Sequence, residues 1–369
     1  MSRPGGPAPE PDCPELGFYG LAGHTDDPHD LLDEIADAER TGLGAVFLSE
    51  RFDTKDAVAL AGAAAAASHR LGIGTAATNP HTRHPLVTAT AATTLHRLSR
   101  GRYALGLGRG FDALSDLIGL PRVTSARLED TVALLRTLWR GEAVADHHGA
   151  AGDFPYLRRT ATGEDRIPVL MVALGERTLE LAGRIADGVV LHTFFTDDTL
   201  ARAVRTVRHA AERAGRDPGS VRIWAVLATV EESVPEELRL RKITGRLATY
   251  LQGYGDVLVR VNGWDPGVLK RFRDDPLVRD HPGPLDAAPA ATLERIGSLL
   301  PDEWLAACAT GSAGHCASRI ADQFGAGADS VILHGATPAE LAPVVAAWRS
   351  RRDPQRFSSL PANPGWRTP

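Results

Sequence analysis

The sequence predicts a closed (β/α)8 barrel with a helical insertion late in the chain. Short apolar segments recur along the 369 residues, and stretches with helical spacing follow them. Polar side chains gather where the apolar segments end, as they do at the carboxyl ends of barrel strands. A doubly wound open sheet is the competing fold, but it does not normally need eight such units in register.

The composition is that of an ordinary soluble globular protein, with 43% hydrophobic and 24% charged residues. A formal net charge of −5 gives no reason to expect a nucleic acid or an anionic membrane as a partner. There is no apolar run of about 18 residues, so no transmembrane helix is expected. Residues 1–15 lack the apolar core of a signal peptide, which predicts a cytoplasmic protein. Cys13, Cys308 and Cys316 have no metal-ligand spacing, so we expect reduced thiols and no metal.

The first half of the barrel is read from four apolar segments and the signals between them. A helix is expected to begin at Pro28 and to end before Gly42, and the Ala-rich stretch 56–70 predicts a second helix. His84-Pro85 opens a third helix, which Gly101 ends. The predicted strands are 16–23, 45–49, 71–77 and 103–107.

The second half follows an amphipathic helix over 125–140 and a loop over 141–165, where His147 and His148 are assigned to the surface. The predicted strands are 167–173, 189–193, 221–230 and 330–334, and the predicted helices are 179–186, 199–214, 312–326 and 338–352.

One domain therefore spans residues 16–352, and an insertion at 231–310 is expected to cover one side of the barrel mouth. Helices are expected over 235–251 and 293–310, with an irregular region rich in Gly, Pro and Asp between them. Residues 1–15 are predicted to form a disordered leader and 353–369 a flexible tail.

The chain lacks the common nucleotide and hydrolase motifs. The glycines at 106–110 resemble a dinucleotide turn, but no Gly-x-x-Gly continuation opens a helix after them. There is no phosphate loop and no Gly-x-Ser-x-Gly elbow.

The candidate site is instead the set of polar residues at the strand ends. Together they offer one carboxylate, several hydrogen-bond donors and two guanidinium groups, which suits a large planar anionic ligand. The set contains His24, Glu50, Arg51, Thr78, Asn79, Gly108, Arg109, His192 and Thr193. Backbone N–H groups after Gly175, with Arg177 and Thr178, could hold a phosphate at a helix N-terminus. The structural alternatives are that Glu50 and Arg51 pair with each other and that Gly175 only makes a turn.

Three segments carry a resemblance to a known family. They are FLSER at 47–51, GTAATNPHTRHPLVTATAATTLHRLSRGRYALGLG at 74–108 and VALGERTLELAGRIADGVVLH at 172–192. The sequence resembles the bacterial luciferase-like monooxygenase superfamily, in the coenzyme F420-dependent branch that is similar to methylene-tetrahydromethanopterin reductase. The resemblance covers residues 16–230 and 312–350.

The resemblance implies a cofactor site at the barrel mouth. It implies a non-proline cis peptide at Ala76-Ala77 that supports the flavin ring from behind, with Thr78 and Asn79 at the polar edge of the ring. Gly108, Arg109 and His192 would line the same site. The cofactor phosphate would lie against Leu174, Gly175, Glu176, Arg177 and Thr178.

The chain departs from the family at Arg51, where many relatives carry a His that acts as acid and base. Arginine does not exchange a proton near neutral pH, so the acid would be Glu50, His24, Lys55 or His192, with Glu50 favoured by its position. Arg51, Lys55 or Arg109 would stabilise charge on a substrate oxygen.

The resemblance thus implies an F420-dependent oxidoreductase that transfers a hydride between the deazaflavin and a small organic substrate. Two alternatives keep the fold. One is a monooxygenase that uses reduced FMN and oxygen, and the other is a barrel that binds a ligand without catalysis. By family analogy we expect a homodimer.

Overall fold

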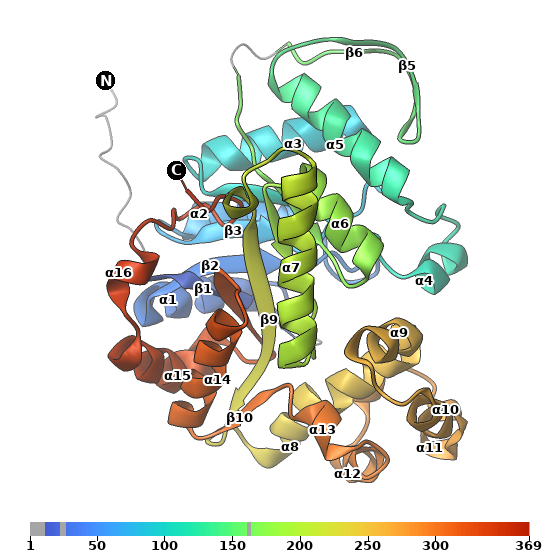
Figure 1. Cartoon of the computed structure of the whole chain (residues 1–369), viewed down its shortest axis with the longest axis vertical. Helices are drawn as coiled ribbons and strands as arrows, with labels where there is room; N and C mark the ends of the chain where they lie inside the picture. The colour runs from blue at the N-terminus through green and yellow to red at the C-terminus, as the bar shows by residue number, and fades with distance from the viewer. Residues whose placement is uncertain (1–11, 23–26, 161–163, 369) are drawn as a thin grey trace.

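The computed structural model describes residues 12–22, 27–160 and 164–368, and its eight parallel strands close into a barrel (Figure 1). Each strand pairs with the next in chain order, and the pairing of the eighth strand with the first closes the ring. The predicted (β/α)8 fold is confirmed. The barrel strands are β1 (Cys13–Tyr19), β2 (Leu43–Leu48), β3 (Gly72–Thr75), β4 (Tyr103–Leu107), β7 (Val169–Val172), β8 (Gly188–Val190), β9 (Arg222–Glu231) and β11 (Ser330–His334).

Helices surround the barrel, and several of them begin at N-cap residues that accept hydrogen bonds from the first helical turn. Asp56 accepts a hydrogen bond from Ala59 N at 2.8 Å, and Thr337 forms a capping box with Glu340. Pro85 occupies the first turn of its helix, as predicted. The outer helices are α1 (Asp30–Thr41), α2 (Ala57–Ala67), α3 (Pro85–Leu98), α4 (Asp112–Leu117), α5 (Ser125–Trp139), α6 (Glu176–Ile185), α7 (Asp197–Arg213), α14 (Ala313–Gly325), α15 (Pro338–Arg351) and α16 (Pro354–Phe357).

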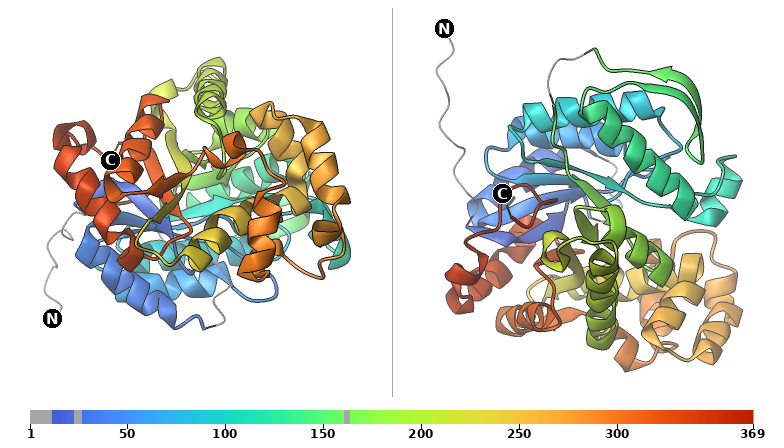
Figure 2. Two further views of the ribbon diagram at one scale, coloured as in Figure 1. Left: turned by 90° about the horizontal axis from the view of Figure 1, so that it is seen from below. Right: turned by 45° about the horizontal axis from the view of Figure 1, so that its top comes forward.

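The insertion is a helical cap at one end of the barrel, and it has its own apolar core (Figures 1 and 2). Trp264 and Trp304 stack inside it with ring centroids 4.5 Å apart. A short strand, β10 (Ala309–Gly311), then extends the sheet beside β9. The cap helices are α8 (Glu236–Leu240), α9 (Arg246–Asn262), α10 (Pro266–Asp274), α11 (Pro276–Arg279), α12 (Ala290–Gly297) and α13 (Asp302–Leu305).

The prediction of an irregular region between residues 252 and 292 is wrong, because its Gly and Pro residues mark helix ends. Gly263 ends α9 in the left-handed conformation with φ 67°, and Pro266 then begins α10 under an Asp265 cap. The Gly, Pro and Asp residues that end and begin short helices were therefore interpreted as one irregular region.

The predicted loop at 141–165 contains an antiparallel hairpin, β5 (Val144–Gly149) and β6 (Gly152–Leu157). Six of its twelve strand positions are Asp, His or Gly, which hid the strand pattern. His147 Nε2 lies 3.1 Å from Asp130 Oδ2, and His148, on the exposed face, lies 2.8 Å from Asp153.

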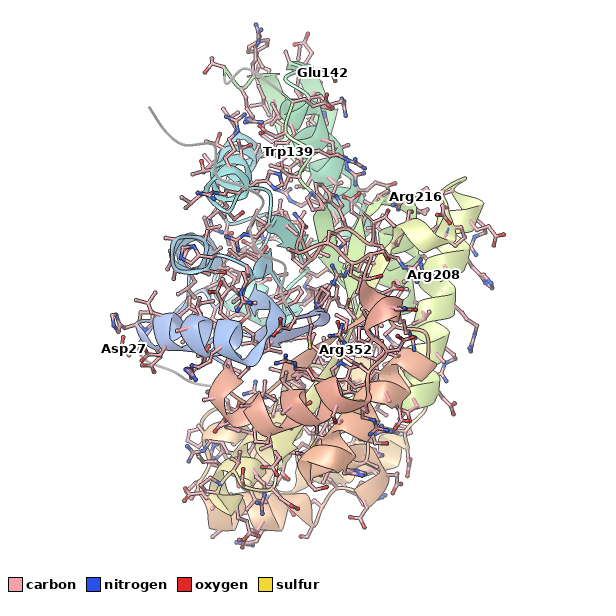
Figure 3. The ribbon with its side chains drawn as sticks, turned by 90° about the vertical axis from the view of Figure 1, so that its left-hand side faces the viewer. Asp27, Trp139, Glu142, Arg208, Arg216 and Arg352 are labelled. Atoms are coloured by element: carbon pink, nitrogen blue, oxygen red, sulfur yellow. The ribbon has the colours of Figure 1, made fainter. Side chains whose placement is uncertain are left out.

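The first residues that the structure describes belong to the barrel. Residues 1–11 of the predicted leader lie outside the described residues, but β1 begins at Cys13 and not at Leu16. Glu15 is fully buried, and its Oε1 accepts one hydrogen bond, from Trp348 Nε1 at 2.9 Å. The same oxygen forms an ion pair with Arg352, which Figure 3 labels, at 2.9 Å from Nε. These contacts tie the start of β1 to α15.

The expectation of a flexible tail is also wrong, because residues 361–366 close the bottom of the barrel. Nη1 of the buried Arg222 donates to the carbonyl oxygens of Asn363, Pro361 and Trp366 at 3.0, 3.2 and 3.2 Å. A Cβ built on Gly72 would lie only 2.1 Å from the carbonyl oxygen of Ala362, so the tail backbone lies directly on β3. The Pro-rich composition of the segment predicted mobility, but hydrogen bonds from Arg222, which is distant in sequence, hold residues 361–366 in place.

Replacing Arg222 with Met should lower the free energy of unfolding by about 4 kcal/mol, because several buried carbonyl groups would lose their donor. Urea denaturation followed by circular dichroism measures this change. The control is Arg356→Met, which removes an exposed guanidinium that donates to Phe324 O at 3.2 Å and should cost about 1 kcal/mol. Equal effects of the two substitutions would contradict the anchoring role of Arg222.

Candidate active site

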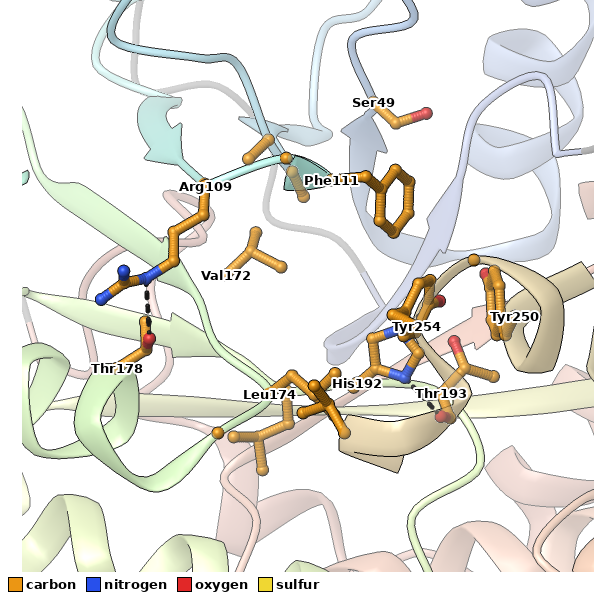
Figure 4. A pocket seen from close by; sticks show the side chains of 18 of the residues that line it. Ser49, Arg109, Phe111, Val172, Leu174, Thr178, His192, Thr193, Tyr250 and Tyr254 are labelled. Carbon is orange, nitrogen blue, oxygen red and sulfur yellow. Dashed lines mark hydrogen bonds between the residues drawn. The ribbon is translucent and has the colours of Figure 1, made fainter. Parts of the chain in front are cut away.

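A cavity of about 2090 Å³ opens at the carboxyl ends of the barrel strands, between the mouth and the cap. It is lined by strand-end residues, by α4, by the N-terminus of α6 and by one face of α9 (Figure 4). Apart from His24 and Lys55, the candidate site residues read from the sequence all line it. His24 lies outside the described residues, and Lys55 is buried beside the cavity.

The floor of the cavity is made of small side chains at the ends of β3 and β4. The peptide bond between Ala76 and Ala77 is cis, as the resemblance implies. A Cβ on Gly108 would lie 2.8 Å from the Cβ of Ala77, so β4 has room only for glycine there. Val172 on the neighbouring strand β7 continues the surface (Figure 4). Together these residues make an apolar face on which a planar ring can lie.

Thr78 and Asn79 stand at the edge of this floor, and both are buried. Thr78 donates its hydroxyl hydrogen to Glu50 Oε2. The Asn79 side chain donates to Arg109 O at 3.2 Å and accepts from His81 N at 2.7 Å. The backbone of this loop is therefore fixed by its own side chains.

Arg109 connects three elements beside the cavity. Its Nε donates to Thr178 Oγ1 at 3.1 Å, drawn as a dashed line in Figure 4, and Nη1 donates to Val123 O at 3.0 Å. Nη2 donates to the hydroxyl of Ser125 at the start of α5. Burial lowers the pKa of Arg109. Arg109 thus braces the ends of β4, α5 and α6 against one another.

The N-terminus of α6 faces open space. Gly175 is its N-cap residue, no side chain caps the helix, and a Cβ on Gly175 would meet no atom within 4 Å. Arg177 is exposed on the first turn and Thr178 is buried. Uncapped N–H groups, the positive helix end and a nearby guanidinium suit a phosphate.

Glu50 is held in an ion pair with a residue that the sequence analysis missed. Arg83 donates to both carboxylate oxygens of Glu50, at 2.8 Å from Nη1 to Oε2 and 3.2 Å from Nη2 to Oε1. The same guanidinium donates to Asp56. The signal was present in the sequence, since Arg83 lies in the polar loop that also contributes Thr78. The pairing favours a structural role for Glu50.

Arg51 and Lys55 differ in exposure although they form one turn. Arg51 is exposed at the mouth, whereas Lys55 is 7% exposed and its Nζ donates to Leu21 O. Burial, and secondly the charge of Arg51, lower the pKa of Lys55 to about 8. Behind it, Glu34 accepts from Leu21 N at 2.7 Å, and burial raises the pKa of Glu34 to about 7.

Replacing Glu34 with Gln should stabilise the protein more at pH 8 than at pH 4.5. The native carboxyl keeps its proton up to a pKa of about 7, whereas the unfolded one loses it near 4.5. Stability is therefore unaffected below pH 4.5, falls as the pH rises from 4.5 to 7 and stays lower above that. The gain of Glu34→Gln relative to the native chain should grow by about 2 kcal/mol across this window, measured by urea denaturation.

Glu39 on the same helix is the control, because its pKa is shifted the other way. Burial alone would raise the pKa of Glu39, but hydrogen bonds from the backbone of Arg70 and His69 and from Ser68 lower it. Glu39→Gln should therefore lose stability relative to the native chain as the pH rises toward 4.5, and the difference should change little above that pH. The same sign of change in both variants would contradict this reading of Glu34.

A histidine and a tyrosine form a hydrogen-bonded pair at the far end of the cavity. His192 Nδ1 lies 2.7 Å from Thr193 O, and its Nε2 lies 2.8 Å from the hydroxyl of Tyr254. A carbonyl oxygen only accepts, so Nδ1 carries the proton and Nε2 accepts from Tyr254. Burial lowers the pKa of His192 to about 4, which keeps the ring neutral near pH 7.

Other aromatic side chains surround this pair. Phe111 stacks on Tyr254 with ring centroids 4.8 Å apart, and Tyr250 lies 5.1 Å from His192. His334 Nδ1 lies 2.9 Å from Thr193 Oγ1. The sequence analysis missed Tyr250 and Tyr254 because they lie in the insertion. Their spacing of four residues, with Arg246 four residues earlier, was the available signal of one helix face.

Other kinds of site find no support in the described ranges. No group of three or more His, Cys, Asp or Glu side chains that could hold a metal occurs there. Nor does any helix of that part of the chain combine the length and apolarity needed to cross a bilayer. The cysteines are free and buried, and burial raises the pKa of Cys13 to about 12 and that of Cys316 to about 11.

The fold and the cavity define a parallel barrel with a large cavity at the carboxyl ends of its strands, where barrels of this class bind their ligands. The sequence model of the luciferase-like monooxygenase family matches residues 14–330. The chain belongs to this family, whose relatives reported below are oxidoreductases.

Two relatives illustrate the range of the family. The chain is 29% identical over 234 residues to 5,10-methylenetetrahydromethanopterin reductase from Methanolobus tindarius, covering 62% of this chain and 69% of that one. It is 35% identical over 180 residues to F420-dependent glucose-6-phosphate dehydrogenase from Beutenbergia cavernae, covering 44% of this chain and 52% of that one. Here the match spans only about half of the relative.

A solved structure extends the likeness to nearly the whole fold. Coenzyme F420-dependent tetrahydromethanopterin reductase from Methanopyrus kandleri superposes with a TM-score of 0.73 at 20% identity, covering 92% of this chain and 98% of that one. At this identity the superposition supports the fold alone.

Proposed function

We propose that the protein is an F420-dependent oxidoreductase that transfers a hydride between the deazaflavin and a small organic substrate. The observation that carries the proposal is the cavity, which combines an apolar floor at Ala76 and Ala77 with an open, uncapped helix N-terminus at Gly175. The relative named as an F420-dependent glucose-6-phosphate dehydrogenase supports the choice of cofactor.

The residues present fit such a cofactor. Ala76, Ala77 and Val172 would lie against one face of its ring system, and Thr78 with Asn79 would lie at the polar edge. The N–H groups that follow Gly175, together with Arg177, would hold the phosphate. When bound, the deazaflavin supplies a carbon that accepts or releases a hydride.

The chain itself must handle the proton that accompanies the hydride. Oxidation of an alcohol to a carbonyl releases a hydride from carbon and a proton from oxygen. We assign proton transfer to Tyr254, whose oxygen would accept the substrate proton while its own proton passes to His192 Nε2. Reduction of a carbonyl runs the same transfers backwards.

This assignment differs from the initial preference for Glu50. Both oxygens of Glu50 are occupied by Arg83 and by the hydroxyl of Thr78, so moving a proton there would break a buried ion pair. Arg51 and Lys55 remain candidates for stabilising charge on a substrate oxygen.

A cofactor titration tests the proposal. The purified protein should quench or shift the spectrum of F420, and the bound cofactor should be reduced by a substrate without oxygen uptake. Binding of reduced FMN alone, with oxygen uptake, would instead support the monooxygenase alternative. Binding of neither cofactor would support the non-catalytic barrel.

We further propose that the active form is a cytoplasmic homodimer acting on a small molecule. Both statements rest on analogy with the family. Sedimentation equilibrium measures the oligomeric state, and a monomer at micromolar concentration would contradict the dimer.

A further inference from the structure

The end of the cavity beside α9 contains a buried positive charge that the proposed cofactor and proton transfer do not use. Arg246 is the first residue of α9, its side chain is 4% exposed, and it lines the cavity. Removing a guanidinium from water this far is unfavourable unless its N–H groups find acceptors.

The guanidinium of Arg246 lacks such acceptors in the described ranges. Its buried Nε has no hydrogen-bond partner there. The carboxylate oxygen paired with it, Asp286 Oδ2, lies 3.9 Å from Nη2, which is beyond hydrogen-bond distance.

Arg246 stands out from other arginines with a buried, unpaired Nε. Arg102, for example, donates through both Nη atoms to backbone carbonyl groups and lies away from the cavity. Among the described residues with such an atom, Arg246 alone lines the cavity. Its donors are therefore available to a bound molecule.

Neighbouring charges make this end of the cavity positive. The pKa of His334 is lowered first by burial and then by electrostatic interactions with Arg246, His192 and Arg51. Lys55 is a third cation within reach of the same field. Two carboxyl groups oppose these cations, Asp286 beside Arg246 and Glu34 beside Lys55, and the pKa of Glu34 is raised to about 7. The balance favours an anion.

The geometry of α9 separates this charge from the proposed proton transfer. Arg246, Tyr250 and Tyr254 follow one another at four-residue spacing and all line the cavity. At 1.5 Å per residue, Arg246 and Tyr254 lie about 12 Å apart along the helix. Figure 4 shows Tyr250 and Tyr254 together at the end of the cavity opposite Arg109 and Thr178. A substrate that reacts beside Tyr254 can therefore reach Arg246 with a distant group.

We propose that the substrate carries an anionic oxygen group, a carboxylate or a phosphate, which Arg246 binds through its guanidinium. The statement that the bound anion belongs to a substrate rests on the proposed function, whereas the anion site itself does not depend on it. A planar guanidinium is suited to paired hydrogen bonds with either group. The fixed distance to Tyr254 would then select molecules whose reacting carbon and charge are correctly separated.

Titration with small anions tests the proposal on the protein as isolated and on the protein saturated with F420. The probes are inorganic phosphate, succinate and uncharged glycerol, and the readout is the thermal midpoint, with the spectrum of the bound cofactor as a second signal. We expect phosphate or succinate to bind and glycerol to have no effect. Arg246→Gln should weaken anion binding at least about tenfold, and Arg246→Lys should restore part of it.

The matched control is Arg271→Gln, which removes the same charge from an exposed position on α10 that does not line the cavity, and it should change the affinity less than about twofold. Anion binding is also measured in Gly175→Asp and in the double variant Gly175→Asp/Arg246→Gln, because Gly175→Asp blocks anion binding at the N-terminus of α6. Two results would overturn the proposal. One is anion binding that Arg246→Gln leaves unchanged, and the other is no anion binding up to about 50 mM, a concentration at which even a single ion pair would be detected. If F420 failed to bind but Arg246→Gln still abolished anion binding, the proposed function would be wrong and the anion site would still stand.

Discussion

Replacing Tyr254 with Phe should lower kcat about 100-fold while changing F420 affinity less than about twofold. The substitution removes one oxygen, and with it the hydrogen bond to His192 Nε2 at 2.8 Å. The ring remains, so its stacking on Phe111 and its packing in the cavity wall are retained. A large fall in kcat without loss of cofactor is therefore the signature of lost proton transfer.

The measurement is steady-state turnover, followed by the absorbance of the oxidised deazaflavin, with a panel of small alcohols that carry a carboxylate or a phosphate. Tyr250→Phe is the control, since Tyr250 contacts the His192 ring but the described hydrogen bond to His192 comes from Tyr254. It should lower kcat less than about threefold. If both variants turned over like the native enzyme, proton transfer would have to be reassigned to Lys55 or Glu50.

The pH dependence gives a second check on the same pair. The pKa of His192 lies near 4 in the folded chain and near 6.5 when unfolded. The unfolded state therefore takes up a proton as the pH falls from 6.5 to 4, and this loss of stability should shrink in His192→Gln. Activity that depends on neutral His192 should persist down to about pH 5, if no other group limits it.

Sequence reasoning succeeded where the chemistry follows the chain locally. A strand, its polar end and the helix that follows lie within about 30 residues, so Thr78, Asn79 and Arg109 could be assigned to one rim from their order alone. The roles within that rim were harder. Glu50 and Arg83 are 33 residues apart, and only the folded chain shows that they neutralise each other.

The missed elements have physical causes of the same kind. Residues around Asn363 have the Pro-rich composition of a free tail, yet Arg222 holds them from 141 positions away. In the insertion, glycines at 253 and 255 lower the apparent helix propensity around Tyr254, and α9 is kinked there, with φ −149° and ψ 30° at Tyr254. Residues on both sides of the kink pack into the apolar core of the cap, and these long-range contacts could not be read from local propensity.

Replacing Gly175 with Asp should weaken F420 binding about 100-fold without destabilising the fold. Gly175 is the N-cap of α6 with φ −97° and ψ 157°, a conformation that any residue adopts, and its Cβ position is open. Aspartate is a preferred N-cap residue, so the substitution should leave stability unchanged or raise it slightly. Its carboxylate would occupy the place and repel the charge of the cofactor phosphate.

Gly175→Ser separates the two parts of this effect, because serine caps the same N–H groups without a charge. Fluorescence titration should show a loss of about tenfold or less for Ser and a larger loss for Asp that diminishes as salt is added. Screening acts on charge repulsion but not on occupied space, so the salt dependence identifies the cause. Native affinity in Gly175→Asp would mean that the phosphate lies elsewhere, and the assignment of α6 to the cofactor would then be wrong, while the apolar floor at Ala76 and Ala77 would be unaffected.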